Sequence, residues 1–376
     1  MDEIKKYLPG IDALRAIGAL SVIIGHIELS KFSFGIKNVK DSIPFFKYTS
    51  GHLGVILFFV ISGFLITYLM LVEKNNFKQV NIKKFYIRRI LRIWPIYFLI
   101  ILLLIFVFPK IINIDYYGKI NSFSDLNFTT ILMYLFLVPN LVVFGINGIG
   151  GGYHLGTIGT EEQFYLIWPI LFKYFNNLFI PLMFIFISIT LAPHISDFIN
   201  FNYIKNIQFK QVFFNITNFF NHFKINCMAL GGLFSYIYYL NKSFILKFLY
   251  SNIVQLVSFI LGFGLWILGF HLSYFNDEFY AILFSIIILN LSTNPNSLLK
   301  LDNKMMNFLG KISYGMYIYH WIIIYMIIDL LNKFELDIMY YNILLYLLTL
   351  LVTILISYLS YKYFESYFLK LKSKFY

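Results

Sequence analysis

The chain has 376 residues, of which 59% are hydrophobic and 13% charged, against roughly 25% charged in an ordinary soluble domain. This composition excludes a soluble globular protein, and apolar runs of about 20 residues, long enough to cross a bilayer, recur along the chain. The net charge of +12 would suit nucleic-acid binding, but lysine and arginine also collect in the cytoplasmic loops of membrane proteins. We therefore expect the lipid bilayer as a partner and no nucleic acid.

The apolar runs lack the period-two alternation of a transmembrane barrel, so helices must satisfy the backbone polar groups in lipid. We expect an all-α, polytopic transmembrane bundle that forms a single membrane-embedded domain over residues 1–376, with no C-terminal soluble domain. The single cysteine, Cys227, excludes an intrachain disulfide and a cysteine metal cluster, and no metal site is expected.

About ten full crossings are predicted. They lie at residues 13–32, 52–72, 86–108, 158–175, 178–194, 225–240, 250–271, 279–294, 309–331 and 339–361. The piece 128–145, broken by Pro139 and Asn140, is predicted to be re-entrant. Placing both termini in the cytoplasm puts most lysines and arginines on that side, as expected for a multi-pass protein of a bacterial cytoplasmic (inner) membrane. The longest external loops are then 33–51, 109–127 and 195–224.

The first predicted helix carries three ionisable residues on one face. Arg15 and His26 are eleven residues apart, which places them within ~20° of each other and ~16 Å apart along the axis. Asp12 lies near the same face, at the cytoplasmic mouth. An imidazole in mid-membrane suggests a functional group that takes a proton from a hydroxyl. Alternatively, His26 only hydrogen-bonds a neighbouring helix and Arg15 extends to the interface.

The second predicted helix carries three small residues at positions that matter for packing. Gly54, Ser62 and Gly63 favour close helix packing over a chemical role. His52, at the outer edge of this helix, is interpreted as an interfacial polar residue.

The third predicted helix opens with the basic stretch KKFYIRRILRIWPIY. Arg88 and Arg92 are four residues apart and share a face, with Arg89 beside them. Three guanidinium groups suit a ligand with several phosphates, such as coenzyme A, a nucleotide or an anionic lipid. Positive-inside topology with lipid headgroup contact is the alternative.

The segment HLGTIGTEEQFYLIWPIL enters the bilayer with two adjacent acids. Glu161 and Tyr165 share a helix face, while Glu162 points elsewhere, so at least one acid should face the bundle interior. A carboxylate there could orient an imidazole or act as an acid or base towards a hydroxyl. The alternative is a structural hydrogen bond to the preceding glycine-rich loop.

In the predicted helix 309–331, Tyr314, Tyr317 and His320 are spaced three apart and form a polar stripe on an apolar helix. The stripe could line a cavity. An aromatic belt at the membrane interface is the alternative.

Taken together, these segments resemble the acyltransferase 3 family of integral membrane acyltransferases, from residue 7 to about 368. The matching motifs are Arg15 with His26, the GVILFFVISGF run at 54–64, Arg88-Arg89-x-x-Arg92-x-x-Pro95, the EEQFY run at 161–165, and ISYG at 312–315 followed by His320 and Trp321. The sequence departs from many relatives at Ile56, where they carry an acid, and at Gly156, where they carry tryptophan.

The resemblance implies an O-acetyltransferase that transfers an acetyl group from acetyl-CoA, a co-substrate and not a permanently bound cofactor, to a carbohydrate hydroxyl. The acceptor would be a cell-surface polysaccharide, a lipopolysaccharide or another lipid-linked glycan. His26, Glu161 and Glu162 are the predicted catalytic residues. The acyl-CoA ligands are then Arg15, Arg88, Arg89 and Arg92, and the acceptor pocket comprises Asp12, Tyr165, Tyr314 and His320. Succinyl or other acyl transfer and a non-enzymatic transporter are the alternatives.

Overall fold

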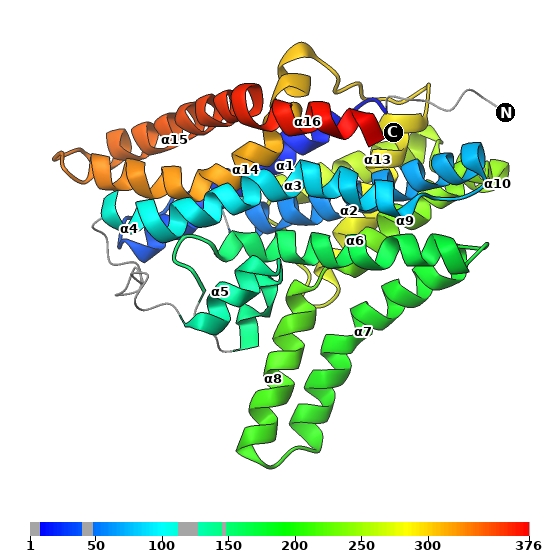
Figure 1. The fold of residues 1–376 in the computed structure, drawn as a ribbon, viewed down its shortest axis with the longest axis horizontal. Coiled ribbons are helices and arrows are strands. Elements are labelled where there is room, and N and C mark those ends of the chain that lie inside the picture. Colours follow the sequence, from blue (N-terminus) through cyan, green and yellow to red (C-terminus); the bar gives the residue numbers. More distant parts are fainter. Residues whose placement is uncertain (1–7, 40–47, 112–126, 145–147, 376) are drawn as a thin grey trace.

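The computed structural model describes residues 8–39, 48–111, 127–144 and 148–375, and every regular element in these ranges is helical (Figure 1). Residues 40–47 of the predicted loop 33–51 and residues 112–126 of the predicted loop 109–127 lie outside the described residues. The longer helices are α1 (Ile11–Ser33), α2 (Tyr48–Phe77), α3 (Ile82–Leu102), α6 (Gly156–Tyr174), α7 (Phe179–Asn202), α8 (Ile207–His222), α9 (Ile225–Tyr239), α13 (Asn276–Thr293), α14 (Lys304–Leu331) and α15 (Ile338–Ser360).

In the described part of the chain, six helices are long and apolar enough to cross a membrane. They become seven if α10 (Ser243–Leu249) and the helical run Asn252–Ile267, bent by 52°, form one span. The chain is therefore a multi-pass helical membrane protein, as predicted. The other three predicted crossings coincide with α6, α9 and α13, which are helical.

Two predicted segments take a more specific form. The piece 128–145 contains α5 (Phe128–Leu135), whose eight residues rise only ~12 Å, and a 3-10 turn at Pro139–Phe144, so α5 is too short to cross a bilayer. The expected loop 195–224 is largely helical, because α7 continues to Asn202 and α8 follows. These two helices form a hairpin that projects from the bundle (Figure 1).

Glycines let the central helices approach closely, as the sequence predicts for α2. A Cβ on Gly63 would lie 1.9 Å from the carbonyl oxygen of Met228 in α9, and one on Gly54 would lie 2.7 Å from the carbonyl oxygen of Gly18 in α1. On the other side of α1, a Cβ on Gly310 of α14 would lie 2.1 Å from the Asp12 carbonyl oxygen. Larger side chains are excluded at these contacts, so α1 is held between α2 and α14.

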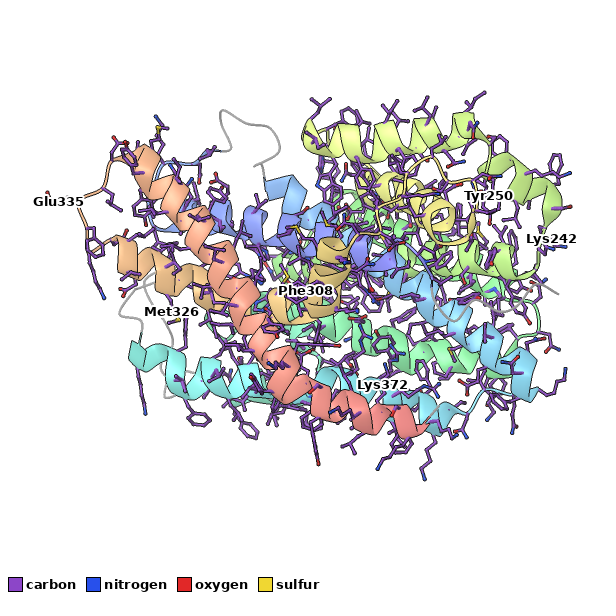
Figure 2. All side chains as sticks on the ribbon, turned by 90° about the horizontal axis from the view of Figure 1, so that it is seen from above. Lys242, Tyr250, Phe308, Met326, Glu335 and Lys372 are labelled. Atoms are coloured by element: carbon purple, nitrogen blue, oxygen red, sulfur yellow. The ribbon has the colours of Figure 1, made fainter. Side chains whose placement is uncertain are left out.

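The C-terminal helices close one side of the bundle. Figure 2 shows α15 continuing through a π-helical turn (Tyr361–Glu365) into α16 (Ser366–Lys372), diagonally across the neighbouring helices. There Phe375 O accepts a hydrogen bond from Arg88 of α3 at 2.9 Å. The start of α3 is fixed by Asn81, whose side chain accepts from the Lys84 amide.

Candidate active site

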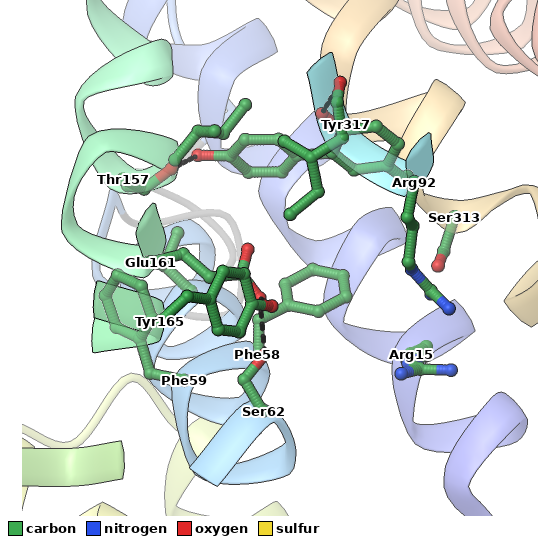
Figure 3. Close-up of a pocket in the computed structure, with 14 residues that line it drawn as sticks. Arg15, Phe58, Phe59, Ser62, Arg92, Thr157, Glu161, Tyr165, Ser313 and Tyr317 are labelled. Atoms are coloured by element: carbon green, nitrogen blue, oxygen red, sulfur yellow. Dashed lines mark hydrogen bonds between the residues drawn. The ribbon is translucent and has the colours of Figure 1, made fainter. Parts of the chain in front are cut away.

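A cavity of about 90 Å³ lies where α1, α2, α3, α6 and α14 meet (Figure 3). Its lining comprises Arg15, Val55, Phe58, Phe59, Ser62, Arg92, Ile93, Thr157, Ile158, Glu161, Tyr165, Ser313, Tyr314 and Tyr317. We call it the arginine cavity. At about 10–15 Å³ for each water, it has room for roughly six to nine water molecules. Five helices therefore bring together residues that the sequence placed in separate motifs.

Two arginines supply the positive charge of this cavity. Arg15 from α1 and Arg92 from α3 lie on the same side of it (Figure 3), close enough to repel each other. One oxygen of Asp12 lies 3.5 Å from Arg15 and offsets part of that repulsion. Two neighbouring guanidinium groups with one adjoining carboxylate favour an anionic ligand between them.

The two adjacent glutamates have different surroundings. Glu161 faces the arginine cavity, where its Oε1 accepts hydrogen bonds from Ser62 Oγ at 2.7 Å and from the Tyr165 hydroxyl. Glu162 points towards α3 and accepts from Trp94 Nε1 at 3.3 Å. One acid thus faces the interior, and its recorded partners are hydroxyl groups. Ser62, which the sequence suggested only for packing, belongs to the cavity.

The three arginines of α3 separate in the structure. Arg88 forms a 2.7 Å ion pair with Glu73. Arg89 lies over the rings of Phe85 and Tyr165, at 5.6 and 5.5 Å from their centres. Arg88 and Arg89 line a second cavity, of about 320 Å³, between the cytoplasm-facing ends of α2 and α3 as the predicted topology orients them. Arg88 and Arg92, which were predicted to share a helix face, therefore line two different cavities.

A cluster of three histidines lies on the far side of Tyr317, and we call it the histidine cluster. His26 Nδ1 is 2.7 Å from His320 Nε2, and the two rings lie edge to edge, with their centres 4.9 Å apart and their planes 6° from parallel. The His154 ring, from the turn before α6, lies 5.2 Å from the His320 ring. His320 and His154 are buried, while His26 is only partly buried.

The hydrogen bond between His26 Nδ1 and His320 Nε2 has one donor, so two tautomeric arrangements fit it. His320 Nδ1 has no hydrogen-bond partner among the described residues. Where His26 Nδ1 donates, His26 Nε2 is left as a basic nitrogen. The 2.7 Å distance between His26 Nδ1 and His320 Nε2 is that of a hydrogen bond. It is too short for two nitrogens that bind the same zinc ion, because zinc–nitrogen bonds of ~2.0–2.1 Å would place them ~3.3 Å apart.

Tyr317 and Thr157 separate the two parts of the site. The Tyr317 hydroxyl lies 3.0 Å from the His154 carbonyl oxygen and 2.6 Å from Thr157 Oγ1. Both residues line the arginine cavity, and His26 does not. The sequence predicted that Arg15 and His26 share one helix face. In the structure, the hydrogen-bonded Tyr317 lies between the arginine cavity and the cluster that contains His26.

The remaining predicted residues also lie at this site. Tyr314 lines the arginine cavity and donates to the Ile93 carbonyl oxygen at 3.1 Å. The polar stripe of α14 therefore faces inward, as one of the two interpretations expected. His154 was missed, because it follows an irregular glycine-rich segment without helical periodicity. Its only sequence signal is an imidazole beside a run of glycines in an apolar region.

The fold and the site define a class: a helical membrane protein with a cavity lined by two arginines beside a cluster of imidazoles. The profile of the acyltransferase 3 family, described as an acyltransferase domain, matches residues 8–362. The chain belongs to this family, which confirms the resemblance seen in the motifs.

Curated relatives include O-acetyltransferases of Gram-positive bacteria. The chain is 26% identical over 374 residues to the O-acetyltransferase OatA of Staphylococcus aureus, covering 96% of this chain and 57% of that protein. It is 31% identical over 170 residues to the peptidoglycan O-acetyltransferase OatA of Listeria monocytogenes, covering 44% of this chain and 24% of that protein. The chain thus spans little more than half the length of the first of these relatives. No solved structure matches it.

Proposed function

We propose that the protein is a membrane O-acyltransferase that moves an acetyl group from acetyl-CoA to a carbohydrate hydroxyl. The observation that carries the proposal is the imidazole of His26, whose Nδ1 is hydrogen-bonded to His320 Nε2, beside a cavity with two arginines. In the proposed reacting form His26 Nδ1 donates to His320, and Nε2 is the base. The names of the relatives support a glycan acceptor such as peptidoglycan or another surface polysaccharide.

The donor enters from the cytoplasmic side. Arg15 and Arg92 bind its anionic groups at the arginine cavity, and the larger cavity at Arg88 and Arg89 accommodates the nucleotide end. This orientation rests on ten crossings with both termini in the cytoplasm of a bacterial inner membrane, which the distribution of lysine and arginine supports. For the acyl group to reach His26, Tyr317 has to move aside, since Tyr317 lines the arginine cavity and its ring centre lies 5.7 Å from that of His320.

Transfer needs one base and one acid, and His26 serves as both. Its Nε2 takes the proton of the acceptor hydroxyl while that oxygen attacks the thioester carbonyl carbon. The carbon–sulfur bond then breaks, and the thiolate leaving group takes the proton back from the imidazolium. Alternatively, Nε2 attacks the thioester carbonyl carbon first and expels the coenzyme A thiolate; the acceptor hydroxyl then attacks the acyl carbon and displaces the imidazole, while the hydroxyl proton passes to the thiolate. Glu161 holds Ser62 and Tyr165 in the cavity wall and is a positioning residue in this scheme.

The test is transfer of label from radiolabelled acetyl-CoA to polysaccharide or glycolipid in membranes that contain the protein. We expect the His26→Ala variant to lose transfer while its insertion and thermal unfolding stay unchanged. His222→Ala is the matched control, because His222 is exposed on α8 and contacts only the Asn218 carbonyl oxygen of its own helix among the contacts of the described chain. Full transfer by His26→Ala would refute the proposal.

A further inference from the structure

A second polar site lies away from the arginine cavity, where the ends of α2, α8, α9 and α13 meet the middle of α7. It is a cavity of about 290 Å³ that contains both acidic and basic side chains, and we call it the outer pocket. In the predicted topology these helix ends face the external side. None of the motifs identified in the sequence explains this cavity.

An aspartate with two basic partners forms one wall of the outer pocket. Asp277 Oδ1 is 2.8 Å from His52 Nε2, and Asp277 Oδ2 is 2.8 Å from Lys224 Nζ. Although burial opposes its charged form, His52 and Lys224 hold the pKa of Asp277 well below its usual value. This carboxylate therefore stays ionised and fixed, with its charge balanced inside the wall.

Beside it, a buried amide has an acceptor atom without a partner. Asn226 is only 2% exposed, and its Nδ2 donates to Glu278 Oε1 at 2.6 Å and to Thr190 Oγ1 at 3.1 Å. The carboxylate accepts only, so it fixes the orientation of the amide. Asn226 Oδ1 then has no hydrogen-bond partner among the described residues, although it is buried in the pocket lining. A ligand hydroxyl could satisfy this acceptor.

Aromatic rings form the rim of the outer pocket. The side chains of Tyr274 and Phe275 are 70% and 46% exposed, which leaves their faces open to a ligand. The His194 ring lies 4.7 Å from the Phe275 ring. Phe275 has a left-handed backbone (φ 56°), which is unusual for a bulky residue and fixes the ring at this edge. The rim therefore offers apolar faces above a floor of hydrogen-bonding groups.

The outer pocket lies at the depth of His26. A Cβ on Gly51 of α2 would lie 3.2 Å from Gly25 Cα of α1. His52 and His26 are the next residues of these two helices, so they sit at one level on the two sides of the α1–α2 contact. The His26 ring turns to α14 and the His52 ring to α13.

We infer that the outer pocket binds an uncharged hexopyranose ring of the acceptor glycan. Asn226 Oδ1 and Glu278 accept hydrogen bonds from sugar hydroxyls, and the apolar face of the ring packs on Phe275 and Tyr274. The inference rests on the proposed transfer to a carbohydrate and deepens it by locating an acceptor subsite. Because acceptor and donor then bind at different cavities, each can be impaired separately.

The test measures sugar binding without catalysis. The full chain carrying His26→Ala is reconstituted in lipid nanodiscs and titrated with chitotriose and with cellotriose, and with sorbitol as an acyclic polyol. Two further variants are made in this background. Phe275→Asn removes the ring and keeps a residue that tolerates the left-handed backbone, and Asn226→Ala removes the unpartnered acceptor. Tyr340→Asn, at an exposed position of α15, is the control.

We expect at least one of the two trisaccharides to bind more tightly than sorbitol, and each pocket variant to weaken its binding roughly fivefold or more, with acetyl-CoA binding unchanged in both variants and thermal unfolding unchanged in Phe275→Asn. Tyr340→Asn should bind as the parent does. The inference is overturned if neither trisaccharide binds at millimolar concentration, or if both pocket variants bind like the parent. If the trisaccharide binds here but the wild-type chain transfers no acetyl group in the labelled acetyl-CoA assay, the proposed function alone is refuted, because the binding test contains no donor.

Discussion

The hydrogen bond between His26 and His320 allows a quantitative prediction for the His320→Leu variant. His320 is fully buried, and its Nε2 is the recorded partner of His26 Nδ1 at 2.7 Å. Leucine fills the space with apolar atoms but accepts no hydrogen bond. The Nδ1–H of His26 then either remains unpaired or moves to Nε2, which removes the base from the reacting side.

The size of the effect follows from the lost partner. Leaving a buried donor unsatisfied costs about 1–3 kcal/mol, and about 1.4 kcal/mol corresponds to a factor of ten in rate. We therefore expect kcat for acetyl transfer to fall roughly 5- to 150-fold, while KM for acetyl-CoA stays unchanged because His320 does not line the arginine cavity. His320→Gln, which can still accept from His26, should recover part of the loss.

The assay is steady-state transfer of radiolabelled acetyl groups in reconstituted vesicles, with His222→Leu as the control on the exposed face of α8. Thermal unfolding in detergent verifies that each variant is folded. If His320→Leu keeps the wild-type kcat, or if it changes KM for acetyl-CoA and leaves kcat intact, the proposed orientation of His26 is wrong.

Three further predictions concern other parts of the molecule. Arg92→Gln should raise KM for acetyl-CoA roughly 10- to 100-fold, since a charge-assisted contact contributes about 1.5–3 kcal/mol, and Lys210→Gln on exposed α8 should not; equal KM values would contradict the assigned donor site. Gly63→Ala should lower the unfolding temperature, because its Cβ would lie 1.9 Å from a carbonyl oxygen of α9, whereas Gly264→Ala should change little, as its Cβ meets only one atom, at 3.9 Å. Asp277→Asn should also lower the unfolding temperature, and its difference from the wild type should shrink as the pH falls below about 4. The reason is that a carboxyl group with a lowered folded-state pKa stabilises the fold above its unfolded pKa and loses this effect in acid. If the difference in unfolding temperature between Asp277→Asn and the wild type did not change with pH below about 4, Asp277 would not be charged in the folded protein.

Helical periodicity was sufficient to place groups that lie within one helix. The four-residue spacing of Glu161 and Tyr165 predicted a shared face, and their side chains are hydrogen-bonded in the structure. The small residues of α2 predicted close packing, and Gly54 and Gly63 have it. Spacing within one helix could not predict that Arg88 and Arg92 have different surroundings, because Arg88 is held by Glu73 of α2 and by the C-terminal segment.

The spacing of residues within a helix could not predict which side chains from different helices would meet. The histidine cluster combines residues from α1, the turn before α6, and α14, and His26 and His320 are 294 positions apart. The outer pocket depends on His52 and Asp277, which are 225 positions apart and were not paired by any motif. The predicted polar stripe of α14 also did not reveal that Tyr317 would lie between the arginine cavity and the histidine cluster.

The sequence by itself determined that this chain is a helical membrane protein of the acyltransferase 3 family and which residues carry its ionisable groups. Lipid forces apolar segments into helices, and that constraint can be read from composition alone. The tertiary structure decided which of those groups meet, since the rotation and depth of each helix follow from packing against all its neighbours at once.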